Sequence, residues 1–333
     1  MREALADFAM KCAVVVALAM YLPSRGQATP ILQDPAGASS YRESDAALLE
    51  RARTLAQTAS LEEAEQTIRR YLAHNEASAE GHFLLGYILF KAAKPKDSLQ
   101  EYTEAAKYQE PGASELKIVA LDYGLLDDYP DAERWLKESL ARNSKDVESW
   151  YYLGRAQYSE NHFADALNSF AHCLALDPRH VKAKANLGLA LEGLHRTEEA
   201  AAAYRAAISW EEQGATASAE PYIDLGSLLL EQNQNEQAVT YLLQAVKIAP
   251  EEVRARERLG TAYFRLNKLS EAQTQLEKAV QLTPTNSAIH YILGQTYRKE
   301  GLLDKARTEF ARATELNGSH SSLAPGDHGI AKP

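Results

Sequence analysis

Apolar and small residues recur along this chain at helical spacing, in blocks of 34 residues that polar turns separate. The clearest block runs from Val147 to His180 and reads VESWYYLGRAQYSENHFADALNSFAHCLALDPRH. Apolar positions three or four residues apart lie on one face of an α-helix. The block therefore predicts two helices joined by a short turn, and the same frame predicts such a pair in each block from Asp45 to Gly318.

Small residues recur where the two helices of a pair must touch. Gly154 marks this position in the first helix, and its equivalents are Ala52, Gly86, Ala120, Gly188, Gly226, Gly260 and Gly294. Ala166 marks it in the second helix, and its equivalents are Ala64, Ser98, Ala132, Ala200, Ala238, Ala272 and Ala306. Glycine inside a helix costs about 1 kcal/mol relative to alanine. Its recurrence therefore predicts a close contact between the two helices that compensates for this cost.

The signature residues of the central block follow one another in almost the order of a known family. They are Trp150, Leu153, Gly154, Ala166, Phe170, Cys173 and Pro178. In this order and in its period the chain resembles the tetratricopeptide-repeat (TPR) family. The resemblance implies an all-α fold, a right-handed superhelical solenoid of about eight helix-turn-helix repeats. The frame places the starts of these repeats near residues 45, 79, 113, 147, 181, 219, 253 and 287.

The sequence departs from the frame in three places, namely in the first repeat, in the spacing between two repeats and at two prolines. Arg51 and Tyr71 replace the expected leucine and alanine in the first repeat, as in a polar terminal cap. The spacing between the fifth and sixth repeats is 38 residues, and the extra length falls in 211–218. Pro95 and Pro130 lie in or just after the turns inside the second and third repeats. No capping helix is evident after the eighth repeat, so its last helix is expected to expose an apolar face to a partner or to a second copy.

The first 28 residues differ in pattern from the repeats. Arg2 and Lys11 bracket an early segment, residues 12–22 are apolar, and Gly26 and Ala28 are small residues before a cleavage position. This order is typical of a secretory signal peptide. It predicts a secreted protein, in the periplasm or envelope of a bacterium. The apolar run is shorter than the roughly 20 residues of a membrane span; an uncleaved N-terminal membrane anchor and a buried helix are the alternatives.

Two other segments lack a helical period. Residues 29–44 are rich in Pro, Gly, Ala and Ser, which predicts a flexible linker. Residues 319–333 predict a disordered tail. The expected organisation is thus a signal peptide or anchor over 1–28, a linker over 29–44, the repeat solenoid over 45–318 and a tail over 319–333.

The charge of the chain limits its partners. It has 46 acidic and 36 basic side chains and a formal net charge of -10. This excess of acid disfavours general affinity for nucleic acid or anionic membranes. The expected partners are proteins or peptides, with membrane contact only through an uncleaved N-terminal segment.

No arrangement of residues indicates catalysis, a cofactor or a metal site. The glycines occur one per repeat instead of clustering into a phosphate-binding loop, and neither a nucleophile elbow nor HExxH is present. His162, His172 and His180 are too widely spaced to form a metal pair on one helix turn. Cys173 stands at a small, buried position of the repeat, so we interpret it as a packing residue, with a redox or metal role as the alternative.

The resemblance to TPR proteins also indicates which residues line the concave groove. In that family, positions two before and one, two, five, eight and nine after the signature Trp position face this surface. The residues selected in this way are Phe83, Tyr87, Phe90, Tyr151, Tyr152, Arg155, Tyr158, Lys182, Asn186, Arg254, Arg258, Phe264, Arg265, Tyr291, Gln295 and Arg298. Aromatic rings provide contact area, and arginine offers two donors to a carboxylate. The alternative is that the rings pack between neighbouring helices and the arginines pair with nearby acids such as Asp224.

The sequence therefore predicts a non-enzymatic scaffold that binds an extended peptide in its concave groove. Acidic or C-terminal carboxylate groups of the peptide are the expected ligands of the cations. The chain matches the carboxylate clamp of some TPR proteins poorly, because Leu189, Glu220 and Asp224 replace its Asn or Lys residues. The alternative function is a structural subunit of an envelope complex, for secretion, pilus or cell-wall assembly, that uses its convex face or self-associates through the last repeat.

Overall fold

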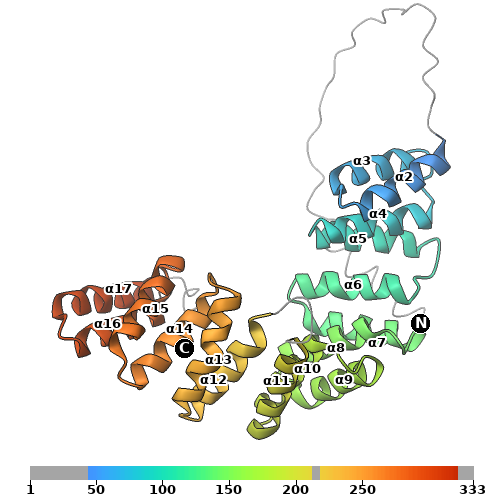
Figure 1. Ribbon diagram of the computed structural model, residues 1–333. Helices are drawn as coiled ribbons and strands as arrows, with labels where there is room; N and C mark the ends of the chain where they lie inside the picture. The colour runs from blue at the N-terminus through green and yellow to red at the C-terminus, as the bar shows by residue number, and fades with distance from the viewer. Residues whose placement is uncertain (1–43, 212–217, 322–333) are drawn as a thin grey trace, which may run out of the picture. The chain divides into compact units, whose positions relative to one another are not determined.

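A computed structural model describes residues 44–211 and 218–321 of the chain. Within these residues the chain forms sixteen helices and no strand, which confirms the all-α solenoid (Figure 1). The helices belong to two compact units, residues 1–162 and residues 163–333, and we describe each by itself. The expected signal peptide and nearly all of the expected linker lie outside the described residues.

The first unit contains seven described helices. They are α2 (Asp45–Gln57), α3 (Leu61–Leu72), α4 (Ala79–Lys91), α5 (Pro95–Ala106), α6 (Ala113–Leu125), α7 (Tyr129–Arg142) and α8 (Val147–Ser159). Each helix packs against the next one along the chain. The first helices of the repeats, here called A helices, also touch one another in the order α2, α4, α6 and α8. They form one continuous layer, and the second helices of the repeats, the B helices, are α3, α5 and α7.

The second unit contains nine described helices. They are α9 (Phe163–Leu176), α10 (Val181–Gly193), α11 (Thr197–Glu211), α12 (Glu220–Glu231), α13 (Asn235–Ile248), α14 (Val253–Arg265), α15 (Leu269–Leu282), α16 (Ser287–Lys299) and α17 (Leu303–Ser321). Its A helices, α10, α12, α14 and α16, touch in turn. The helix α17 continues to Ser321, so the predicted start of the disordered tail, residue 319, is too early. The remainder of that segment lies outside the described residues.

The recurring glycines allow the A helices that carry them to approach their own B helices closely. A Cβ atom on Gly188 of α10 would lie 2.5 Å from the ring of Tyr204, which is fully buried in α11. On Gly260 it would lie 2.6 Å from Leu276 of α15. Carbon atoms in contact are normally about 3.5–4.0 Å apart. The expected helix contact is therefore present, and a larger residue at these positions would force the helices apart.

A left-handed backbone residue ends the A helix of every described repeat. These residues have positive φ angles, and they are Ala59, Ala93, Asp127, Asn161, His195, Asn233, Asn267 and Gly301. The left-handed conformation is a common way to terminate a helix and favours Gly, Asn and Asp. It reverses the chain toward the B helix, where Pro95 and Pro130 occupy the first turns of α5 and α7 and displace no helical hydrogen bond.

The two unusual residues of the first repeat have separate structural roles. Arg51 of α2 pairs with Glu63 of α3, with 2.5 Å between the charged atoms. Tyr71 of α3 fills the space above Gly81 of the next repeat, where a Cβ would lie 2.8 Å from its ring. Its hydroxyl lies 3.0 Å from the hydroxyl of Ser78. The tyrosine is therefore tolerated because the residue that faces it is glycine.

Among residues 44–211 and 218–321, no helix combines the length and the apolar character that a bilayer span requires.

Candidate functional site

A hollow of the first unit lies across its A helices. This first hollow has a volume of about 810 Å³. Its lining consists of aromatic, aliphatic and charged side chains, namely Arg53, Glu80, Phe83, Leu84, Tyr87, Phe90, Tyr102, Gln109, Ser114, Glu115, Lys117, Ile118, Leu121, Glu148 and Tyr152. Most of these residues come from α4 and α6, with contributions from α2, α5 and α8.

A second hollow of about 300 Å³ adjoins the first. The two share Phe90, Leu121 and Tyr152. The remaining lining of the second hollow comes mainly from α6, α7 and α8, and its one charged side chain is Arg155. We call the two hollows together the first-unit groove, because their shared residues make one apolar surface from α4 to α8.

Ring contacts hold the aromatic side chains of the groove in place. The rings of Phe83 and Tyr102 are tilted, with their centroids 5.9 Å apart. Tyr152 meets Tyr151 edge to face at 5.2 Å. Tyr102 is buried, whereas Tyr87 is 37% exposed. The groove therefore offers apolar surface on side chains whose rotamers are already restricted, which lowers the entropy cost of binding.

The two cations of the first hollow are already paired. Arg53 lies between Glu50 and Glu80, and Lys117 lies 2.7 Å from Glu148 and 3.1 Å from Asp146. Burial acts to lower the pKa of Lys117, but the two carboxylates outweigh it and raise that pKa above its usual value. These cations thus balance carboxylates of the protein itself.

Arg155 is the cation of the second hollow. It is exposed at the end of α8, and its guanidinium lies 5.9 Å from the ring centroid of Tyr151. Tyr151 is only 9% exposed and lines neither hollow, and Tyr158 is half-buried and also lines neither. The structure thus brings Phe83, Tyr87, Phe90, Tyr152 and Arg155 together in the groove, while Tyr151 supports two of them from below the surface.

Several of the candidate residues of the second unit are engaged within the protein. Arg254 pairs with Asp224 at 2.7 Å. Arg265 donates to the backbone carbonyl of Leu230 near the end of α12, where a cation is favoured by the helix dipole. Asn186 donates to the carbonyl of Lys182 at 2.9 Å. For Arg254 the structure therefore supports the alternative of pairing with nearby acids, and Arg265 stabilises a helix end.

The charge pair of Arg254 does not fully compensate for the burial of its partner. Burial raises the pKa of Asp224 to about 6, although the charge of Arg254 acts in the opposite direction.

The other two candidate cations of the A helices α10 and α14, Lys182 and Arg258, are exposed. Phe264 is half-buried, and the ammonium group of Lys299 lies 4.2 Å from its ring centroid.

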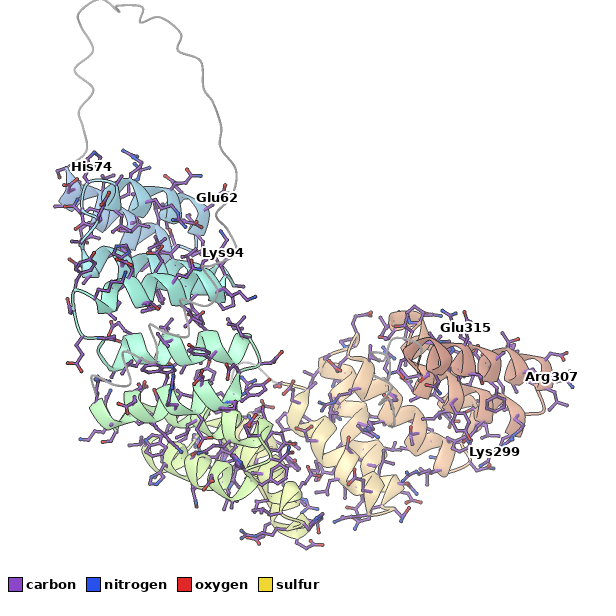
Figure 2. All side chains as sticks on the ribbon, turned by 180° about the vertical axis from the view of Figure 1, so that it is seen from behind. Glu62, His74, Lys94, Lys299, Arg307 and Glu315 are labelled. Carbon is purple, nitrogen blue, oxygen red and sulfur yellow. The ribbon has the colours of Figure 1, made fainter. Side chains whose placement is uncertain are left out.

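A third hollow, which we call the end hollow, lies on the last repeat. It has a volume of about 620 Å³ and is lined by residues of α16 and α17, namely Ser287, Ala288, Tyr291, Arg298, Phe310, Ala313, Thr314 and Asn317. The ring of Phe310 is 5.7 Å from that of Tyr291 and 5.7 Å from the Arg298 guanidinium. Figure 2 shows the charged side chains of Lys299, Arg307 and Glu315 projecting outward from this repeat.

Sequence reasoning missed the contribution of the third repeat to the groove. Lys117, Ile118 and Leu121 of α6 line the first hollow, and Gly124 and Leu125 line the second. These residues stand at the positions one, two, five, eight and nine after the signature position of that repeat. The same positional rule, applied to the third repeat, would have identified them.

Cys173 has the environment of a packing residue. Its side chain is fully buried in α9. Burial, together with the charge of Asp177, raises the pKa of its thiol to about 11. A thiol in this environment is a poor nucleophile and metal ligand, because both roles require the thiolate.

A family model for the tetratricopeptide repeat matches the sequence in five spans. They cover residues 49–115, 120–171, 153–218, 223–286 and 258–321. The match therefore extends over nearly the whole repeat array. A comparison with curated protein sequences gave no match.

Solved structures of repeat proteins resemble this chain. A tetratricopeptide repeat protein from Parabacteroides merdae is 17% identical, with a TM-score of 0.61 over 76% of this chain and 98% of its own. The C-terminal part of a TPR repeat-containing protein from Cytophaga hutchinsonii is 13% identical, with a TM-score of 0.55 over 74% of this chain and 99% of its own. A chain of the APC/C hetero-tetramer Cut9-Hcn1 is 13% identical, with a TM-score of 0.58 over 87% of this chain and 55% of its own. At such identities the likeness shows the fold alone.

Proposed function

We propose that this chain, which belongs to the tetratricopeptide-repeat family, is a non-enzymatic scaffold. In this proposal it holds an extended segment of a partner protein in the first-unit groove. Members of this family bind other proteins or peptides and are generally not catalysts. The groove brings together aromatic, aliphatic and charged side chains suited to that task.

The continuous aromatic and aliphatic surface of the groove is the observation that carries this proposal. Phe90, Leu121 and Tyr152 border both hollows, so a bound segment can pass from one hollow to the other without leaving apolar surface. An extended chain advances about 3.3 Å per residue and places alternate side chains on the same side. Two apolar side chains of such a segment can therefore enter the two hollows.

Arg155 is the residue that we propose as the ligand of a carboxylate on the partner. It is exposed, lines the second hollow and forms no ion pair with any described residue of the first unit. An acidic side chain or a C-terminal carboxylate can accept two hydrogen bonds from one guanidinium. We propose carboxylate recognition for the second hollow alone, because Arg155 lines only that hollow.

Assembly through the last repeat is a second candidate function, and the exposure of Phe310 favours it. The residues that correspond to Phe310 in the two preceding repeats, Leu242 and Leu276, are fully buried, whereas Phe310 is half-buried. Leu276 of the preceding repeat is covered by the next repeat, because Ile289 and Leu293 of α16 complete the buried cluster around it. No described helix does so for Phe310, so a helix of a partner or of a second copy could occupy the end hollow.

Two tyrosine variants separate these functions. Tyr87→Ala alters the first-unit groove, and Tyr291→Ala alters the end hollow; the wild-type side chains are 37% and 52% exposed. We expect Tyr87→Ala to weaken capture of the partner about tenfold, as removal of an interface aromatic does, and Tyr291→Ala to leave capture unchanged. Affinity capture after crosslinking, with helicity checked by circular dichroism, provides the measurement. The opposite pattern would favour assembly through the last repeat, and two unaffected variants would contradict the groove proposal.

We further propose that residues 1–28 direct export of the protein to the bacterial periplasm or envelope. The basic residues, the apolar run and the small residues before Thr29 support this proposal. A reporter enzyme that is active only outside the cytoplasm, fused after Ser44, is expected to be active. Activity that requires an intact apolar run but no cleavage would indicate the membrane anchor instead, and retention of the fusion in the cytoplasm would contradict export.

A further inference from the structure

The polar edge of the first hollow carries more acid than base. Three of its lining residues are carboxylates, Glu80, Glu115 and Glu148, and two are cations, Arg53 and Lys117. Each cation is also held by a second carboxylate outside the lining, Glu50 for Arg53 and Asp146 for Lys117. No cation of this edge is left over for an acidic ligand, and one carboxylate of the lining has no cation of its own.

That carboxylate is Glu115. It accepts a hydrogen bond from the Ser114 hydroxyl at 3.0 Å and has no ion pair among the described residues. It stands in the first turn of α6, where the helix dipole stabilises negative charge. One carboxylate oxygen lies 2.7 Å from the place that a Cβ on residue 112 would occupy, so only glycine at position 112 leaves room for this rotamer.

The charge of Glu115 also acts on the buried floor of the first hollow. Tyr102 forms part of that floor, and burial, followed by the charges of Asp122 and Glu115, raises the pKa of its hydroxyl above the usual range. Burial there disfavours any added charge, but the carboxylate of Glu115 favours a positive charge over a negative one. An added carboxylate there would be repelled.

We propose that the first hollow selects a segment in which a lysine or arginine lies beside the apolar side chain that enters it, with Glu115 as the residue that recognises the cation. This inference rests on the proposed binding of an extended segment in the groove. The two ends of the groove then differ in sign, with Glu115 in the first hollow and Arg155 in the second. A bound segment is therefore basic over the first hollow, apolar at Phe90 and Tyr152, and acidic or C-terminal near Arg155.

Synthetic peptides of defined charge test this inference on the full-length protein. The probes are three fluorescent nonapeptides that share a central Leu-Xaa-Tyr core and carry Lys, Ser or Glu both at Xaa and at the position before the leucine. We expect the Lys peptide to bind about three- to fivefold more tightly than the Ser peptide, the range of a partly exposed ion pair, and the Glu peptide to bind least tightly. At about 1 M salt, where the Debye length is roughly 3 Å, the differences should largely disappear.

Two variants assign the selection to Glu115. Glu115→Gln keeps the shape of the side chain and its hydrogen bond with Ser114 but removes the charge, so it is expected to abolish the preference for Lys. Glu62→Gln is the matched control, because Glu62 lies on α3, is exposed and lines none of the hollows (Figure 2). It should leave the preference unchanged.

Each outcome bears on one of the two proposals. Peptides that bind without charge preference, or that prefer Glu, would overturn the inference while leaving groove binding intact. A preference for Lys that survives in Glu115→Gln would also overturn it. If no peptide binds to the wild-type protein, the groove proposal is contradicted and the inference falls with it.

Discussion

An Asp122→Asn variant is expected to be more stable than the wild-type protein at pH 8 and nearly equal to it near pH 4. Asp122 is fully buried in α6, at a position that other repeats fill with residues such as Ile88, Ala156 and Leu228. Burial raises the pKa of its carboxyl group from 3.8 to about 7, although the hydrogen bond with Ser98 acts in the opposite direction. Between these two pKa values, the folded protein therefore keeps a proton on Asp122 that the unfolded chain releases.

The hydrogen bonds around Asp122 agree with a neutral carboxyl group. The Ser98 hydroxyl lies 2.9 Å from the carbonyl oxygen of Gly86 and 2.5 Å from Oδ2 of Asp122. A hydroxyl has one hydrogen to donate. If that hydrogen goes to Gly86, the short contact with Asp122 requires a proton on the carboxyl group. An asparagine amide can donate to Ser98 in the same way at any pH.

The direction of the pH effect follows from these two protonation states. Between the unfolded pKa of 3.8 and the folded pKa of about 7, the folded state holds more protons than the unfolded state, so stability falls as pH rises. Each unit of pKa difference corresponds to 1.36 kcal/mol, so the loss amounts to at most about 4 kcal/mol. The variant lacks this titration, and its advantage grows over the same range of pH.

Urea unfolding at pH 5 and pH 8, followed by circular dichroism, measures this effect. The control is Asp97→Asn, because Asp97 is an exposed residue of α5 beside Ser98 and its carboxylate remains hydrated. We expect the control to show no comparable gain at pH 8. A stability difference between Asp122→Asn and the wild-type protein that does not change with pH would show that the carboxyl group does not titrate as described.

The helices and their order could be predicted from the sequence because the same pattern of small and apolar positions recurs in eight repeats. The A helices of the first unit begin at Asp45, Ala79, Ala113 and Val147, the same residues at which the frame places the starts of the repeats. One weak pattern would not have fixed these starts, but small residues at matching positions in every repeat did so. The contact of Gly188 with Tyr204 shows the physical reason, since only a small residue fits there.

The candidate site was less predictable, because it depends on how individual side chains are engaged. The positional rule correctly selects residues near the concave surface, but it cannot tell that Tyr151 is buried or that Arg254 is paired with Asp224. These facts depend on contacts between repeats. The negative edge around Glu115 was missed for the same reason, since Lys117 counts as a free cation until its two acidic neighbours are known.

Departures from the repeat are more informative when they are considered together. Ser98 is the only serine at a B-helix position that alanine otherwise fills, and its partner is Asp122, an acid at a buried A-helix position. Each residue alone is unremarkable in the sequence. Their pairing across two repeats becomes visible only when α5 and α6 are placed side by side.

Site-specific photocrosslinking tests the central claim, that the first-unit groove holds a segment of a partner protein. A photoreactive phenylalanine derivative replaces Leu125, which lines the second hollow and is 54% exposed. The same derivative replaces Leu243 of α13 as the control, because that leucine is 43% exposed and lines none of the three hollows. We predict a crosslinked partner from position 125 that Tyr87→Ala greatly reduces, and none from position 243. Equal crosslinking from both positions, or crosslinking from position 243 alone, would contradict the claim.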